Sequence, residues 1–239
     1  MSSSMSRDMQ TTDGKKSWQK TKSENTKTLI LEATLDCFLT LGYNNTTTEK
    51  VASKAGVSRG AMLHHFPQRS DLIHAAVLFL HKKRLELFHE QLTRINFDAK
   101  YSQLGEGIDS FWGQLKSPLF TIFCELQLAA RTDAELKSVL GPATLEYQRS
   151  WHSMAVGIFP DFALSEKFRM ANRITVFLLE GMAMDRAIVG EAKREEIAEQ
   201  VITWLKSALK EMFRDVEGID RESAIKETHQ LSGVEKGKT

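Results

Sequence analysis

The chain has 239 residues, of which 41% are hydrophobic, so it is long enough to bury a sizeable core in one large domain or two smaller ones. The formal net charge of +1 at pH 7 argues neither for nor against a nucleic-acid partner. The two cysteines, Cys37 and Cys124, lie far apart in the sequence and suggest neither a disulfide framework nor a cysteine-based zinc site, so a reducing cytoplasm is the expected compartment.

The N-terminal part of the chain has a net positive charge, whereas the remainder has a net negative charge. Residues 1–83 contain 12 Lys and Arg against 7 Asp and Glu, whereas the remainder contains 20 against 24. A basic front part suits a chain whose N-terminal region meets an anion, although a solvated surface without a partner would explain so modest an imbalance nearly as well.

Residues 1–25 are rich in Ser, Thr, Lys and Gln and are predicted to form a disordered arm. Its lysines either add a salt-sensitive phosphate or minor-groove contact to a DNA-binding domain or remain simply solvated. No apolar segment of this arm resembles a secretory signal. The longest apolar run further on, residues 174–184, is much too short to span a bilayer, so no membrane partner is expected.

Beyond the arm, apolar residues recur at helical spacing with almost no two-residue alternation, which predicts an all-α protein. The first helix is predicted to begin near Thr26 or Thr28 and to end at Gly42. Thr46 and Glu49 have the spacing of a capping box and predict the start of a short second helix.

A tight turn at Gly56 follows this second helix, and Ser58 is expected to cap a third helix that begins near Arg59. Met62 and Phe66 are four residues apart and are expected to point together into a small core. Two short helices joined by Ala-Gly-Val-Ser form the pattern of a helix-turn-helix, in which the third helix of the chain would enter the major groove of DNA.

The first residues of that helix suit contact with bases. Arg59 can make a bidentate contact with guanine, and Gly60 and Ala61 are small enough to allow close approach to base edges and thymine methyl groups. The sequence therefore predicts double-stranded DNA as a partner.

The stretch TTTEKVASKAGVSRGAMLHHFPQRSDLI, preceded by TLDCFLTLGY, resembles the DNA-binding domain of the TetR family of bacterial transcriptional regulators over about residues 27–75. The resemblance implies an N-terminal three-helix helix-turn-helix domain followed by a helical ligand-binding and dimerisation domain. It also implies that Thr47 and Thr48 open the second helix and face the phosphate backbone. Arg69 stands where the family usually has a phosphate-binding lysine, and an ordinary solvated cation is the alternative.

Leu63 departs from the family, which commonly has a tyrosine there whose hydroxyl binds a phosphate. Either His64 replaces that hydrogen bond, or Leu63 contacts a thymine methyl group. His64 and His65 are expected near phosphate at the groove edge. A metal site is the weaker interpretation of the pair, because adjacent helical residues diverge by about 100° and no acidic or cysteine partner follows at i+4.

No catalytic motif is present, so the chain is not expected to be an enzyme or to hold a cofactor or metal. The sequence contains no Gly-x-Ser-x-Gly motif and no cysteine with a credible histidine partner. A helical enzyme would need clustered acid and base residues, whereas only scattered candidates such as Glu125 and His152 occur.

The rest of the chain predicts further helices, with a break at Pro142 in the one near 133–159. The other predicted helices lie near 71–95, 101–115, 118–131, 165–189 and 191–214. The predicted division of the chain is an arm at 1–25, the helix-turn-helix domain at 26–72, the ligand-binding and dimerisation domain at 73–215, and a flexible tail at 216–239.

A sensor cavity is expected among the helices between residues 101 and 159, where aromatic and soft side chains gather. Such a cavity would take a small, largely apolar effector, although most of these side chains are more often core than pocket. The candidate ligand-binding residues are Phe111, Trp112, Phe120, Phe123, Cys124, Gln127, Trp151 and Met154.

The helix from Ile174 to Val189 is apolar on nearly all sides and the next helix is apolar on one side, which predicts a four-helix dimer interface of the kind the family forms. A buried core helix in a monomer is the alternative. The candidate interface residues are Phe177, Met182, Val201, Trp204, Leu205 and Ala208.

The sequence thus favours a homodimeric repressor that binds a palindromic operator and is released by a small effector. A transcriptional activator of the same family remains an alternative, because the sequence does not say where the DNA site lies in a promoter. The second alternative is a helical small-molecule-binding protein without operator specificity.

Overall fold

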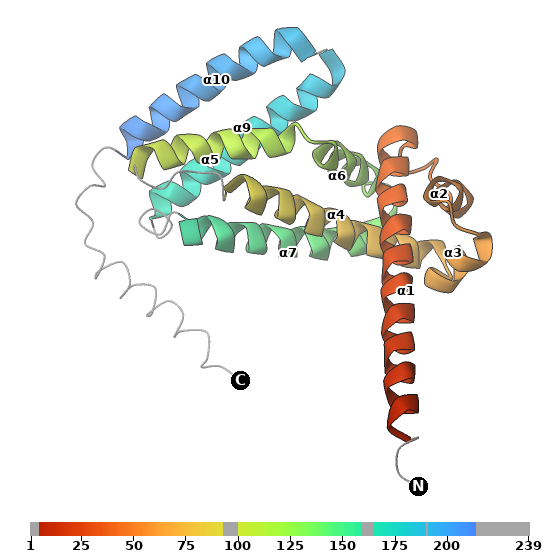
Figure 1. Ribbon diagram of the computed structural model, residues 1–239. Helices are drawn as coiled ribbons and strands as arrows, with labels where there is room; N and C mark the ends of the chain where they lie inside the picture. Colours follow the sequence, from red (N-terminus) through yellow and green to blue (C-terminus); the bar gives the residue numbers. More distant parts are fainter. Residues whose placement is uncertain (1–4, 93–99, 159–164, 190, 214–239) are drawn as a thin grey trace, which may run out of the picture. The chain divides into compact units, whose positions relative to one another are not determined.

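The computed structural model describes residues 5–92, 100–158, 165–189 and 191–213, and no strand occurs among them (Figure 1). This confirms the prediction of an all-α protein. No helix in the described ranges is long and apolar enough to cross a bilayer. The helices are α1 (Met5–Leu41), α2 (Thr48–Ala55), α3 (Arg59–His65), α4 (Arg69–Leu92), α5 (Lys100–Leu115), α6 (Pro118–Ala129), α7 (Ala134–Ile158), α9 (Glu166–Val189) and α10 (Glu191–Met212).

The chain divides into two compact units. The first contains Met1–His81 together with Ile122–Ala143, and the second contains Lys82–Thr121 and Thr144–Thr239. The unit that holds the helix-turn-helix therefore includes a segment, 122–143, that the sequence analysis placed in the second domain. The predicted tail at 216–239 lies outside the described residues.

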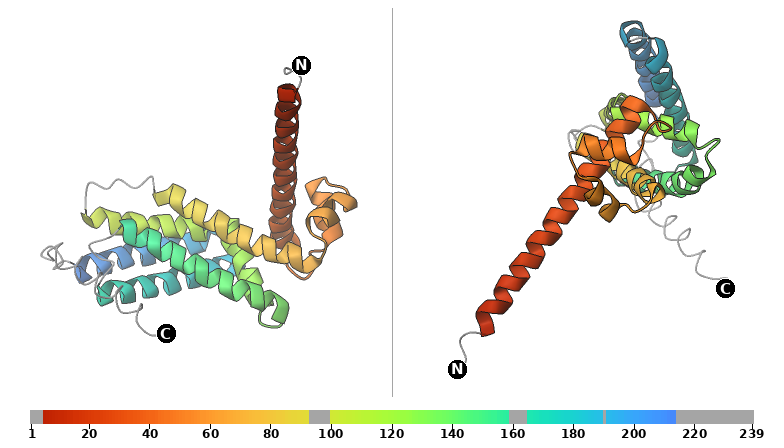
Figure 2. Two further views of the ribbon diagram at one scale, coloured as in Figure 1. Left: turned by 90° about the horizontal axis from the view of Figure 1, so that it is seen from below. Right: turned by 90° about the vertical axis from the view of Figure 1, so that its right-hand side faces the viewer.

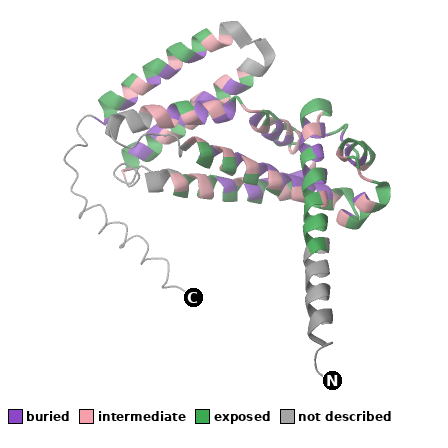
Figure 3. Cartoon of the chain, viewed as in Figure 1, coloured by how far each residue is buried: buried purple, intermediate pink, exposed green. Residues whose placement is uncertain are grey.

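α1 begins at Met5 rather than near Thr26, so residues 5–25 are helical where a disordered arm was predicted. Once a helix is nucleated, each added residue gains one backbone hydrogen bond, and no proline interrupts the segment. The part of α1 that packs into the core lies further along the chain, where Ile30, Cys37 and Phe38 are buried; Figure 3 shows buried positions in this C-terminal half of the helix. The arm is thus an extension of a helix that is held at its C-terminal half.

The second helix starts one residue later than the predicted capping box. The Thr47 hydroxyl accepts a hydrogen bond from the Lys50 N–H at 3.3 Å, so Thr47 and not Thr46 is the N-cap. Thr46 is buried and its hydroxyl donates to the Gly42 carbonyl at 2.8 Å, which removes it from the cap position.

The turn between α2 and α3 has the predicted chemistry. Gly56 adopts φ 66° and closes α2 with a hydrogen bond from its N–H to the Ser53 carbonyl at 3.2 Å. The Ser58 hydroxyl accepts from the Ala61 N–H at 3.1 Å and caps α3. Both predictions are confirmed.

α7 continues through Pro142, so the predicted break is wrong. A proline inside a helix removes one backbone hydrogen bond and crowds the preceding turn. The neighbouring side chains of Leu140 and Ala143 are buried, and this packing keeps the helix continuous across the proline.

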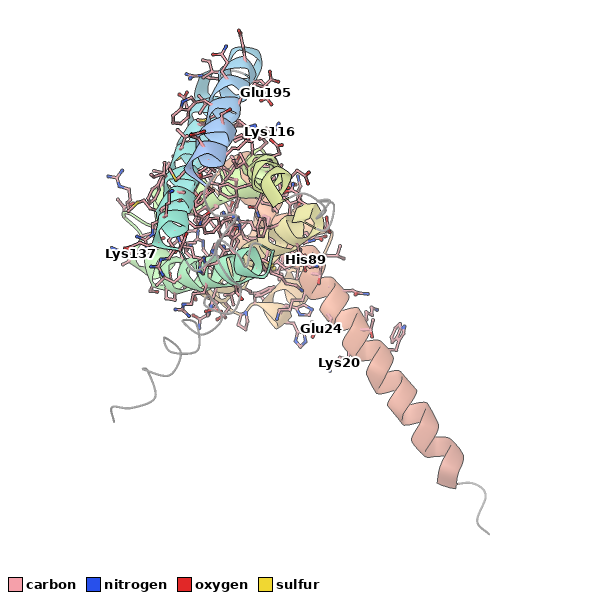
Figure 4. The ribbon with its side chains drawn as sticks, turned by 90° about the vertical axis from the view of Figure 1, so that its left-hand side faces the viewer. Lys20, Glu24, His89, Lys116, Lys137 and Glu195 are labelled. Carbon is pink, nitrogen blue, oxygen red and sulfur yellow. The ribbon has the colours of Figure 1, made fainter. Side chains whose placement is uncertain are left out.

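In the second unit, α10 packs against α5 and α9, and α5 packs against α9. Leu179 of α9 and Ile202, Leu205 and Leu209 of α10 are buried on the packed sides. Ion pairs between exposed ends of these helices, such as Lys116 with Glu195 at 3.0 Å, add little stability because they are solvated (Figure 4).

We predict that Gly56→Ala lowers the free energy of unfolding by about 1–2 kcal/mol, because an L side chain is strained in the left-handed conformation. Gly60→Ala is the matched control: Gly60 has no positive φ, and an added Cβ would meet only the Ser58 hydroxyl at 3.9 Å. Urea denaturation of the two variants measures the difference. Equal stabilities would contradict the role assigned to the turn.

Candidate nucleic-acid interface

α3 has one buried side and one exposed side. Met62 and Phe66 are 1% and 3% exposed and hold the short helix on its small core, as the sequence predicted. Arg59, Gly60 and Leu63 lie on the exposed side. The side chains expected to contact bases are therefore accessible to a partner.

The N-terminal end of α2 borders the same surface. Thr47 and Thr48 open this helix, and Thr48 and Arg59 line an open hollow of about 260 Å³ between α2 and α3. Glu49 also lines the hollow, and sequence reasoning gave it only a capping role. Its own backbone N–H and the Thr47 hydroxyl lower the pKa of the Glu49 carboxyl, with a smaller contribution from Arg59. Glu49 is thus an anion at the edge of the site, and its charge attracts the Arg59 guanidinium.

His64 and His65 end α3 with their ring centroids 5.4 Å apart. Partial burial lowers the pKa of His65, and the nearby His64 and Lys27 charges lower it further. His65 is therefore neutral at pH 7 and can share a hydrogen bond with a phosphate but adds no charge to the site. No group of three or more His, Cys, Asp or Glu in the described part of the chain is placed to hold a metal ion.

Arg69 is tied to residues outside the helix-turn-helix. Its guanidinium carbon lies 4.9 Å from the centroid of the Tyr43 ring, and its Nη1 donates to the Tyr43 hydroxyl at 3.4 Å. The Tyr43 hydroxyl in turn donates to Asp133 Oδ2 at 2.8 Å. Burial raises the pKa of Tyr43, which keeps the phenol protonated as a donor.

Glu125 of α6 closes the end of α1. Its Oε1 accepts the Tyr43 N–H at 3.0 Å, directly after Gly42, which ends α1 with φ 79°. A Cβ at position 42 would lie 3.0 Å from the same oxygen, so any larger residue would crowd this contact. No sequence signal links Tyr43 to Glu125 or Asp133, because the partners are separated by 82 and 90 residues.

The predicted ligand-binding residues fall into both units. Phe123, Cys124 and Gln127 belong to the first unit, where Phe123 packs edge-on against His81 at 5.5 Å. The remaining five belong to the second unit: Phe111, Trp112, Phe120, Trp151 and Met154.

The structure brings three of these five together. The Trp151 ring lies 5.7 Å from Phe111, and Met154 belongs to the same apolar cluster. Sequence reasoning missed Phe88 of α4, whose ring stacks on Trp151 at 5.2 Å.

A buried polar cluster also lies in the second unit. Arg84 is 2% exposed, and its guanidinium lies 4.2 Å from the centroid of the Tyr147 ring. Gln114 Nε2 donates to the Arg84 carbonyl at 2.6 Å. Burial raises the pKa of Glu180, and the Arg84 charge partly offsets this shift. An arginine this deeply buried requires polar or anionic neighbours, which sequence reasoning did not anticipate.

The predicted dimer residues differ in exposure. Phe177 and Trp204 are 73% and 65% exposed, whereas Met182, Val201 and Ala208 are half-buried. Leu205 is buried inside the unit and is therefore not part of the exposed stripe. Met170 and Ile174 extend the exposed stripe of α9, and the sequence analysis did not single them out.

Comparison with known proteins supports a DNA-binding role. Residues 30–76 match the model of a family described as bacterial regulatory proteins, tetR family. An HTH-type transcriptional regulator of Mycobacterium tuberculosis is 27% identical over 197 residues, which cover 80% of this chain and 97% of that protein. TtgR, an HTH-type transcriptional regulator of Pseudomonas putida, is 32% identical over 113 residues, or 47% of this chain and 48% of that protein.

The fold is also similar to solved structures. A TetR-family transcriptional regulator from Rhodococcus sp. aligns with a TM-score of 0.60 over 79% of this chain and 98% of that one, at 18% identity. At this level of sequence identity, the similarity shows only that the two proteins share a fold.

We predict that Asp133→Asn destabilises the protein at pH 7 and that the loss disappears at low pH. The Leu136 N–H and then the Tyr43 hydroxyl hold the pKa of Asp133 below its usual value. A carboxyl group whose pKa is lowered by folding stabilises the protein at pH values above its ordinary pKa of about 3.9. This stabilisation is lost as the pH falls through the pKa of the folded state. Denaturation of wild type and variant between pH 7 and pH 3 measures the difference.

Asparagine keeps the N-cap oxygen that Leu136 requires, so this change isolates the carboxylate. Tyr43→Phe completes a double-mutant cycle. A coupling near zero, or a pH-independent difference, would contradict the contact.

Proposed function

We propose that this chain, whose residues 30–76 match the model of the tetR family of bacterial regulatory proteins, is a homodimeric transcriptional repressor that binds a palindromic operator and is released by a small effector. The observation that carries this proposal is the two-sided α3, which buries Met62 and Phe66 and leaves Arg59, Gly60 and Leu63 accessible.

In the proposed complex, α3 lies in the major groove and Arg59 makes a bidentate contact with guanine. Gly60 and Ala61 allow the helix to approach the base edges. Leu63 is 44% exposed and apolar, which suits contact with a thymine methyl group better than with a phosphate.

Contacts with the sugar-phosphate backbone of the DNA position α3 in the proposed complex. Thr47 and Thr48 stand at the N-terminal end of α2, where hydroxyls and free amides bind phosphate oxygens. His64 is exposed at the end of α3 and can donate to a phosphate in place of the tyrosine hydroxyl common in the family. Arg69 can bind a phosphate in two ways. Its guanidinium either releases Tyr43 when the complex forms, or contacts Tyr43 and the phosphate at the same time.

Dimerisation is supported by the exposed stripe of α9, where Met170, Ile174 and Phe177 recur at helical spacing, and by Trp204 of α10. An exposed apolar stripe of this kind is typical of a protein interface. A two-fold dimer places two recognition helices about 34 Å apart, in successive major grooves, and therefore reads a palindrome.

The effector is proposed to bind in the second unit, near Phe88, Phe111, Trp151 and Met154. These side chains favour a largely apolar or aromatic molecule. Arg84 and its neighbours add a buried cation that favours one acceptor group on that molecule.

A structural path for release begins in α6. This helix starts in the second unit and continues into the first, where Glu125 holds the Tyr43 N–H at the end of α1. An effector that favours a different position of α6 would move the anchor of the helix-turn-helix and so change the spacing of the two recognition helices.

We predict that Arg59→Ala lowers affinity for the preferred duplex by about 5- to 150-fold, the equivalent of about 1–3 kcal/mol, and relaxes the base preference at one position of each half-site. Affinity for a base-shuffled duplex should fall much less. Gel-shift titration on both duplexes measures the two effects.

Arg149→Ala is the matched control, because Arg149 is exposed on α7, outside the helix-turn-helix, and forms a surface ion pair with Glu146. An Arg59 variant that loses affinity equally on both duplexes would contradict base reading by this residue.

We predict that Phe177→Glu shifts the protein from dimer to monomer, because a charge would be buried in the apolar interface. Sedimentation velocity at micromolar concentration measures the change. Leu145→Glu, at a 56% exposed leucine of α7, should leave the dimer intact. A wild-type monomer, or a dimeric Phe177 variant, would contradict the proposed interface.

A further inference from the structure

The N-terminal half of α1 has no role in the helix-turn-helix core. α1 begins at Met5, whereas the family match begins at residue 30. The described side chains from Thr21 to Leu29 are exposed or half-buried, and the first fully buried side chain is Ile30. Figures 1 and 2 show the helix extending past α2 and α3. The extension therefore offers a surface that the core of its own unit does not cover.

This extension is basic. Residues 1–29 contain six Lys and Arg against three Asp and Glu. Among the described side chains, Lys20 and Lys27 are seven residues apart and so share one side of the helix. Lys22 lies on the opposite side, with its Nζ 5.2 Å from the Trp18 ring centroid.

One side of the extension adjoins the end of α3. The charges of Lys27 and Glu24 both act on the His65 imidazole, so these residues lie within electrostatic range of the C-terminal end of the proposed recognition helix. The side that carries Lys20 and Lys27 is therefore the side that borders the DNA-facing surface. The opposite side, with Trp18 and Lys22, is not.

The length of the extension fits a duplex. At 1.5 Å per residue, the helix from Met5 to Lys27 is about 33 Å long, close to one turn of B-DNA. When α3 lies in a major groove, a basic helix that extends past the end of α3 is expected to run close to the sugar-phosphate backbone beyond the bases that α3 reads. Phosphates attract lysines without regard to sequence.

We propose that the N-terminal half of α1 is a second, sequence-independent DNA-binding surface, in which Lys20 and Lys27 bind phosphates of the duplex that flanks each half-site. This inference rests on the proposed DNA-binding function. It assigns the lysines to DNA rather than to the lipid surface that a basic, Trp-containing helix also suits.

The test compares two double variants of equal charge change. Lys20→Gln with Lys27→Gln neutralises the side beside α3, and Lys15→Gln with Lys22→Gln neutralises positions on the other side of the same helix. Affinity for a duplex with about 15 flanking base pairs on each side is measured at several salt concentrations. Circular dichroism checks that both variants keep the helical content of the wild type.

The Lys20/Lys27 variant should make the slope of log affinity against log salt less steep by about 3.6. Each phosphate contact contributes about 0.9 to the steepness, and a dimer would lose four such contacts. The Lys15/Lys22 variant should change this slope by less than about 1. Removing the flanking base pairs should abolish the difference between wild type and the first variant.

Equal slopes for wild type and the Lys20/Lys27 variant would overturn the inference. So would binding of anionic phosphatidylserine vesicles that the same variant loses while its slope on DNA is unchanged. Failure of the proposed function gives a different result: wild type would bind the preferred and the base-shuffled duplex equally. The slopes on the shuffled duplex would then still test the lysine surface, because its contacts do not depend on sequence.

Discussion

The burial of Met62 and Phe66 is the constraint on which the proposed DNA-binding surface depends. A helix of seven residues is not stable alone in water, and α3 exists because these two side chains anchor it and Ser58 caps it. Once they are fixed, the helical period fixes which residues face outward. The position of Arg59 relative to Thr47 and Thr48 then follows from the turn at Gly56, so a very small core sets the geometry of the whole surface.

A second set of contacts, inside the first unit, joins the helix-turn-helix to the segment 122–143. Glu125 binds the backbone at the end of α1, and Asp133 binds the Tyr43 hydroxyl, which also contacts Arg69. These groups are only partly shielded from water, so each contact is weak enough to be exchanged for another. A regulator needs such a junction, because an effector can shift only those equilibria whose states differ by a few kcal/mol.

The parts of this structure that sequence could predict are local. The turn at Gly56, the Ser58 cap and the buried pair on α3 follow from spacing and backbone chemistry within about ten residues, and all were found as expected. The Tyr43 contacts could not be predicted, because they join residues that are brought together only by the tertiary fold. The errors at Thr46 and Pro142 have the same origin, since burial of the threonine and of the proline's neighbours overrides local preference.

Selection of DNA from a random duplex pool by the purified full-length protein tests the central claim most directly. The account predicts enrichment of an inverted repeat whose half-sites are centred about one helical turn apart, as a two-fold dimer with one recognition helix per subunit requires. Enrichment of no sequence, or of a single half-site without symmetry, would contradict the account of a dimeric operator-binding protein.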